Sequence, residues 1–147
     1  MFIKIKYIKK RKIMAENNLS KDELNALSAN NLAYLGDCVY ELYVREYLVK
    51  KNVLHASVES LKYVTAHVQS GVVEKILPIL TPDEDDAYRR GRNLGHTSTP
   101  KSSTVAEYRR ATGLESLFGW LYLSGQHDRL RELFDIAFSE DDEDDAE

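Results

Sequence analysis

The sequence predicts an all-α fold, in one helical domain that spans residues 19–138. Apolar residues recur at helical spacing through most of the chain, and clear helix-start signals precede two of the apolar stretches. No segment shows the alternation of Val and Ile between turns that is typical of strands. Of the 147 residues, 43% are hydrophobic and 30% are charged, which gives enough apolar material for a single core.

The first helical region begins at Ser20, which has the capping-box spacing to Glu23. Its apolar periodicity continues to residue 48, and the sequence does not decide whether the two asparagines at 30–31 interrupt it. Residues 32–49 are apolar nearly all round the helix, apart from a stripe formed by Asp37, Glu41 and Arg45. Such a helix must be covered on most sides, so it is either central in the fold or in contact with a partner chain.

Further helices are expected at residues 58–80, 81–92, 105–123 and from the break at 124–125 to about 138. The Ser-Gly pair at 70–71 is a candidate break within the first of these. The second opens with Thr81, a capping residue, followed by a proline and by acidic residues in the first turn. A loop at 93–104 separates the second helix from the third.

Charge is distributed very unevenly along the chain, although its net value is only −4. Residues 1–14 carry six Lys or Arg and no acid, whereas residues 139–147 carry seven acids and no base. We expect the acidic tail to be disordered. The N-terminal segment 1–18 is interpreted as disordered or as an upstream extension, with an RNA-binding arm as the alternative. Residues 89–110 carry six basic residues and one acid, a local patch suited to phosphate.

Composition also indicates in which cellular compartment the protein is expected. No apolar run approaches the ~18 residues that a membrane span needs, so we expect no membrane association. The single cysteine, Cys38, rules out a disulfide framework within the chain and is expected to be buried as a small apolar side chain. These features fit a reducing cytoplasm.

Two acidic residues stand inside otherwise apolar helical segments, Asp37 and Glu115. A carboxylate in such surroundings is costly unless it is paired or holds a metal ion. Small residues flank Glu115 on its own helix face, which leaves space for an ion or a phosphate. A structural pair with Arg45 or Arg109 is the alternative. Glu41 is expected to form an intrahelical ion pair with Arg45 instead of binding a metal.

These segments resemble the ribonuclease III family. Residues 32–39, LAYLGDCV, are similar to its signature helix, in which a Leu-Gly-Asp step presents a metal-binding aspartate, and residues 115–119, ESLFG, are similar to its second acidic motif. Three shorter segments resemble the subgroup called Mini-ribonuclease III: RGRN at 90–93, TPK at 99–101 and YR at 108–109. The resemblance covers about residues 24–133.

The resemblance implies a helical catalytic domain that works as a homodimer and hydrolyses double-stranded RNA with Mg²⁺, leaving 5′-phosphate and 3′-hydroxyl ends. It implies that Asp37 and Glu115 are metal ligands and catalytic residues. Because the bacterial subgroup is associated with maturing 23S ribosomal RNA, the 23S precursor is the expected substrate. Whether a large-subunit ribosomal protein must present that RNA stays open.

The chain departs from full-length ribonuclease III enzymes at two positions, where Ala33 and Thr112 replace carboxylates that those enzymes use. Mini-ribonuclease III proteins share this reduction. It leaves the number of bound metal ions open, and it supports a catalytically silent RNA-binding module as the alternative function. A helical protein-interaction domain without affinity for RNA is a further alternative.

RNA contacts are expected from the basic loop and its flanks, because these side chains can bind phosphates and 2′-hydroxyls. The candidates are Arg92, Asn93, His96, Thr99, Lys101, Tyr108, Arg109 and Arg110. His67 and Gln69 are weaker candidates, since a lone histidine in a helix is more often packed or solvated. The aromatic residues of the two motif helices are expected to lie in the core or in a dimer interface.

Overall fold

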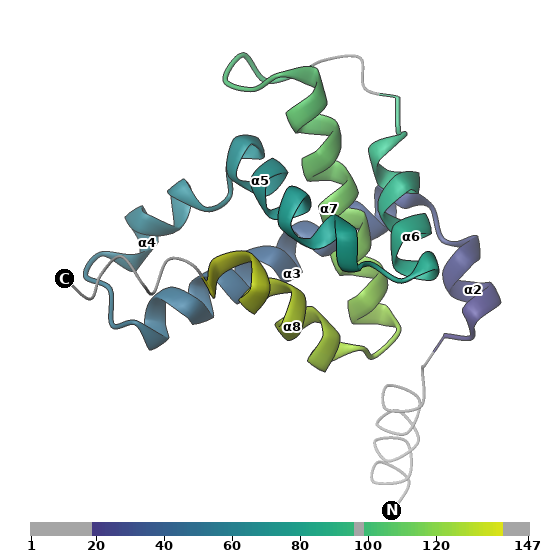
Figure 1. The fold of residues 1–147 in the computed structure, drawn as a ribbon, viewed down its shortest axis with the longest axis horizontal. Coiled ribbons are helices and arrows are strands. Elements are labelled where there is room, and N and C mark those ends of the chain that lie inside the picture. The colour runs from purple at the N-terminus through teal and green to yellow at the C-terminus, as the bar shows by residue number, and fades with distance from the viewer. Residues whose placement is uncertain (1–18, 96–98, 140–147) are drawn as a thin grey trace, which may run out of the picture.

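The computed structural model describes residues 19–95 and 99–139, and within them all the regular structure is helical (Figure 1). The helices are α2 (Lys21–Ala26), α3 (Ala29–Lys50), α4 (Ala56–Glu59), α5 (Ala66–Ile76), α6 (Pro82–Arg92), α7 (Val105–Leu123) and α8 (His127–Phe138), with 3₁₀ turns at Ser60–Lys62 and Leu77–Ile79. The predicted all-α fold is confirmed. The segments 1–18 and 140–147 lie outside the described residues.

Side-chain caps fix where the helices start, as the sequence predicts for Ser20 and Thr81. The Ser20 hydroxyl accepts from the Glu23 N–H, and the Glu23 carboxylate accepts from the Ser20 N–H at 2.7 Å. Thr81 forms the same reciprocal box with Glu84 at the start of α6. A third box, between Thr104 and Glu107, begins α7 and fixes the end of the basic loop.

The structure decides one helix boundary that the sequence left open and corrects another. The asparagines at 30–31 lie in the first turn of α3, because the break falls earlier, at Leu27 and Ser28, which are both extended. Residues 58–80 do not form one helix, since extended Thr65 caps a new helix, α5. The Ser-Gly pair at 70–71 is inside α5 and causes no break there.

Helix α7 runs through the middle of the molecule and packs against α3, α5, α6 and α8 (Figure 1). Its side chains Leu114, Leu117, Phe118 and Leu121 have no exposed surface. A tilted edge-to-face contact joins Phe118 to Tyr40 of α3, with ring centroids 5.8 Å apart. The helix that carries one candidate site residue is therefore the most buried element of the fold, and it provides a rigid support.

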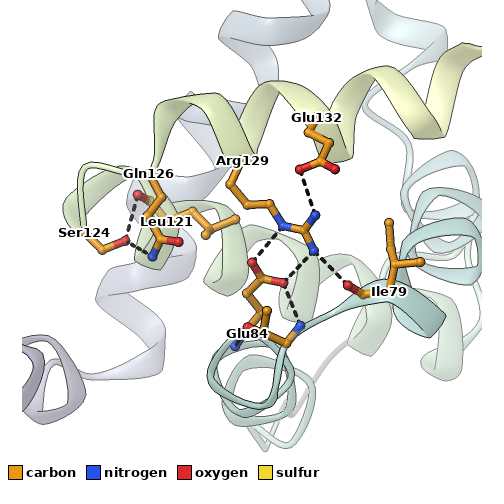
Figure 2. A network of polar contacts seen from close by, with 8 residues as sticks. Ile79, Glu84, Leu121, Ser124, Gln126, Arg129 and Glu132 are labelled. Atoms are coloured by element: carbon orange, nitrogen blue, oxygen red, sulfur yellow. Dashed lines mark hydrogen bonds and ion pairs between the residues drawn. The ribbon is translucent and has the colours of Figure 1, made fainter.

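A buried ion pair joins α8 to the start of α6 (Figure 2). Glu84 is only 2% exposed, and both of its carboxylate oxygens accept from the Arg129 guanidinium, at 2.9 and 3.0 Å. The same guanidinium donates to the Ile79 carbonyl at 2.8 Å and to Glu132 at 2.9 Å. Because the pair is bidentate and every contact is charge-assisted, it holds α6 and α8 in a fixed relation around α7.

The expectation that Cys38 is buried is wrong, because its side chain is exposed on α3. It lies on the same side of the helix as Tyr34, Leu42 and Val49, which are 85%, 58% and 69% exposed. Helix α3 is apolar nearly all round, but the chain itself covers only one side of it. No helix in the described part of the chain is long and apolar enough to cross a membrane.

Candidate active site

Asp37 and Glu115 come from the two longest helices, which cross in direct backbone contact. A Cβ atom placed on Gly36 would lie 1.6 Å from the carbonyl oxygen of Glu115. One placed on Gly119 would lie 2.1 Å from the carbonyl oxygen of Leu32. Because neither glycine has a side chain, α3 and α7 can approach this closely, and the residue after Gly36 is brought beside the turn that carries Glu115.

The two carboxylates lack partners of the usual kind. Within the described residues neither accepts a hydrogen bond or forms an ion pair. Arg45 bonds Glu41 at 2.7 Å, as predicted, and Arg109 forms no ion pair in the part of the chain that the structure describes. The alternative of a structural pair with either arginine is therefore not what the geometry shows.

Electrostatics at the crossing favour a cation. Burial, and then the nearby charge of Asp37, raise the pKa of Glu115 to about 8. Partial burial, and then the charge of Glu41, also raise the pKa of Asp37. Two acids with raised pKa values destabilise each other when both are ionised, and a bound divalent ion would remove that penalty.

A pocket of about 420 Å³ opens beside Glu115. Its wall comes from one face of α7, the first turns of α5 and the loop after residue 99, through Tyr108, Ala111, Thr112, Glu115, Thr65, His67, Gln69, Pro100, Ser102 and Ser103. Most of these side chains are engaged elsewhere: the Thr112 hydroxyl donates to the Tyr108 carbonyl at 3.0 Å, and His67 Nδ1 lies 2.7 Å from Glu107. The small side chains leave the space beside Glu115 open.

The donor set fits a magnesium ion, although it is small. The described residues contain no group of three or more His, Cys, Asp or Glu side chains arranged to hold a metal. At the positions where full-length enzymes carry further carboxylates, Ala33 and Thr112 are buried and supply none. Mg²⁺ keeps several waters and needs only one or two protein carboxylates with substrate oxygens, so Asp37 and Glu115 suffice.

The sequence-predicted RNA-binding residues separate into two groups. Tyr108 lines the pocket beside Glu115. Arg92, Asn93, Arg109 and Arg110 line a second pocket of about 570 Å³ on a different face of α7. This second pocket therefore brings together three arginines from two helices, an arrangement suited to phosphate oxygens.

Some of the residues predicted to contact RNA already interact with other side chains, and others are exposed. Arg110 donates to Ser70 at 3.2 Å and to Glu74 at 3.0 Å. The Arg92 guanidinium lies 5.7 Å from the centre of the Tyr88 ring. Lys101 is exposed in the loop and Thr99 is half-buried there, whereas His96 lies outside the described residues.

Gln69 is only a weak candidate from the sequence, and the close approach of α3 and α7 through paired glycines was not predicted. The Leu-Gly-Asp step and the glycine at the end of the second motif were the available signals for the crossing. For Gln69 no local signal exists, because its position in the pocket depends on how α5 packs against α7.

Comparisons with known proteins show what the chain is similar to. Residues 30–126 match the family described as Ribonuclease III domain. The chain is 41% identical to a Mini-ribonuclease 3 of a Thermoanaerobacter species over 124 residues, covering 81% of this chain and 86% of the relative. It is 45% identical to the Mini-ribonuclease 3 of Symbiobacterium thermophilum, over 72% of this chain and 84% of the relative. A crystal structure of a Fusobacterium nucleatum protein superposes with a TM-score of 0.73 at 29% identity, covering 83% of this chain and 99% of that one.

Proposed function

Because the chain belongs to the ribonuclease III family and to its Mini-ribonuclease 3 group, it is an endoribonuclease of double-stranded RNA, and we propose that Asp37 and Glu115 form its magnesium-dependent active site. The observation that carries the proposal is the pair of carboxylates without partners at the glycine-lined crossing of α3 and α7. Structural ion pairs account for the other acids near this crossing, such as Glu41.

The chain's own residues would bind and orient the reacting groups. Asp37 and Glu115 would hold one Mg²⁺, which supplies a Lewis acid for the scissile phosphate and lowers the pKa of the attacking water. The buried backbone of α7 keeps Glu115 fixed, so little reorganisation is needed when RNA binds. The small side chains beside Glu115 leave room for the strand, and the proposed products are a 5′-phosphate and a 3′-hydroxyl.

Carboxamide substitutions test the site. Asp37→Asn and Glu115→Gln should each abolish magnesium-dependent cleavage of a duplex RNA while leaving helix content and duplex binding nearly unchanged, because both changes are close to isosteric. Glu41→Gln is the matched control, since Glu41 lies one turn from Asp37 but is paired with Arg45. Wild-type cleavage rates in both site variants, in nuclease-free preparations, would reject the assignment.

We also propose that a second copy of the chain covers the exposed side of α3. The support is the row of exposed apolar side chains Tyr34, Leu42 and Val49 on the side of α3 that the chain itself does not cover. A symmetric dimer would present two sites to the two strands of one duplex. Sedimentation should give about twice the 16.8 kDa chain mass, and a monomer that still makes double-strand cuts would contradict this.

The proposed natural substrate is the precursor of 23S ribosomal RNA in the bacterial cytoplasm, on the basis of the family resemblance. Mapping the cleaved ends of precursor RNA, with and without large-subunit ribosomal proteins, tests both the substrate and the need for a protein that presents it. The same magnesium-dependent assay separates cleavage from the alternative of a silent RNA-binding module.

A further inference from the structure

Gln69 is an unusual member of the pocket beside Glu115. Its side chain is only 2% exposed and forms part of the pocket wall. Its amide nevertheless makes no hydrogen bond within the described residues. The amide atoms of Gln69 are not fully enclosed: among the described residues, the side-chain atom that is both fully enclosed and without a partner is the Tyr47 hydroxyl. Since Gln69 lines the pocket, we infer that the accessible surface of its amide faces the pocket.

Buried amides are hydrogen-bonded in nearly all proteins, so an unpartnered one at a pocket wall is available to bind a ligand. Two other polar groups of this wall, both on α7, differ in whether they already have a partner. Thr112 already donates to the Tyr108 carbonyl, whereas Glu115 has no partner and is assigned to the metal ion. Among the buried polar residues of the wall, Gln69 is therefore the one that remains for the substrate.

The position of Gln69 is fixed by the packing of α5 on α7. Arg110 of α7 donates to Ser70, the next residue along α5, at 3.2 Å and to Glu74, one turn further, at 3.0 Å. Thr65 caps the start of α5 by accepting from the Val68 N–H. The backbone that carries Gln69 is therefore fixed, which sets the place from which its side chain reaches the pocket wall.

The charges around the pocket indicate which part of an RNA strand Gln69 contacts. None of the described residues that line the pocket is Lys or Arg, whereas the second pocket contains Arg92, Arg109 and Arg110. Phosphate oxygens are best bound by such cations. A neutral amide that can both donate and accept is matched instead by a hydroxyl group, which has the same two capacities.

We propose that Gln69 is a substrate-contacting residue that binds the 2′-hydroxyl of a ribose next to the scissile phosphate, and that it thereby favours RNA over DNA in the active site. This inference rests on the proposed function, because it places the scissile phosphate at Asp37 and Glu115. The 2′-hydroxyls of an RNA duplex lie in its wide, shallow minor groove, where a side chain can reach them.

A coupling experiment tests the contact. Single-turnover cleavage is measured at saturating enzyme on RNA duplexes in which one ribose at a time, within a few nucleotides of the cut, is replaced by its 2′-deoxy form. For the wild type we expect one position at which this removal slows cleavage about tenfold, equivalent to ~1.4 kcal/mol. Gln69→Leu should cut the all-ribose duplex about tenfold more slowly and show no further loss at that position.

Matched controls separate the contact from a fold defect. Gln126→Leu makes the same change at the exposed start of α8 (Figure 2) and should behave as the wild type on every duplex. Helix content and melting temperature are measured for each variant, and Gln69→Met, which preserves side-chain length, replaces the Leu variant if that variant is unstable.

Two results would overturn the inference: full wild-type activity of the Gln69 variant, or a 2′-deoxy penalty that persists undiminished in it. If either result is found while the wild type cleaves and Asp37→Asn does not, only the role of Gln69 is rejected. A wild type that does not cleave any duplex with magnesium rejects the proposed function itself.

Discussion

Replacing Gly36 by Ala should separate α3 from α7 and displace Asp37 from Glu115. The added Cβ would lie 1.6 Å from the Glu115 carbonyl oxygen and 2.8 Å from the Gly119 nitrogen. Since ordinary contact needs about 3.5 Å, the helices would have to move apart by about 2 Å at this point. Both obstructing atoms belong to the backbone, so a change of side-chain rotamer cannot relieve the clash.

The expected cost follows from that geometry. Overpacking a core costs about 1–3 kcal/mol when side chains can adjust, so we expect a loss of about 3 kcal/mol in the free energy of unfolding for Gly36→Ala. In a domain of this size that corresponds to a melting temperature lower by roughly 10 °C. A displacement of about 1 Å at reacting groups can cost on the order of 100-fold in rate, so cleavage should fall at least that far.

Thermal unfolding by circular dichroism and single-turnover cleavage of a duplex RNA measure the two effects. Gly71→Ala is the matched control, because a Cβ there meets nothing within 4 Å and Gly71 lies inside a helix. That variant should be more stable by about 0.5–1 kcal/mol and fully active. If Gly36→Ala melts with the wild type and cleaves normally, the helix crossing is not as close as described and the reasoning fails.

Three further predictions concern charge. The pKa of Glu115 is raised from 4.5 to about 8, so the folded metal-free protein keeps a proton that the unfolded chain releases at lower pH. The free energy of unfolding, measured in EDTA, should therefore fall as the pH rises from about 4.5 to about 8. Glu115→Gln should lessen that fall. Arg129→Met leaves buried Glu84 unpaired and should cost about 3 kcal/mol by urea denaturation, whereas Arg131→Met, at a more exposed pair, should cost under about 1 kcal/mol. Arg92→Ala should weaken duplex binding at every sequence and flatten the log-affinity against log-salt slope by roughly one unit, and an unchanged slope would exclude a phosphate contact.

Local signals account for the parts of the structure that the sequence predicts well. Capping residues act on N–H groups three positions later, so Ser20 and Thr81 mark helix starts without reference to the rest of the fold. The ion pair between Glu41 and Arg45 likewise depends only on helical spacing.

Boundaries and exposure were predicted less well, because they depend on packing between distant segments. Ser70 and Gly71 are poor helix formers, yet they continue α5, where the Ser70 hydroxyl accepts from Arg110. Cys38 belongs to an apolar run, and only the placement of the other helices decides which side of α3 is covered. Apolar periodicity gives the faces of a helix but not the neighbours that bury them.

The sequence by itself determined the helical fold, the two acidic motifs and the basic loop between them, because each is carried by residues within a few turns of one another. Only the tertiary structure brought Asp37 beside Glu115, through glycines that let two helix backbones touch. It also set the unpartnered amide of Gln69 in the wall of the pocket that Glu115 lines. The physical reason is that a contact between remote residues depends on the close packing of whole helices, and no spacing along the chain records that packing.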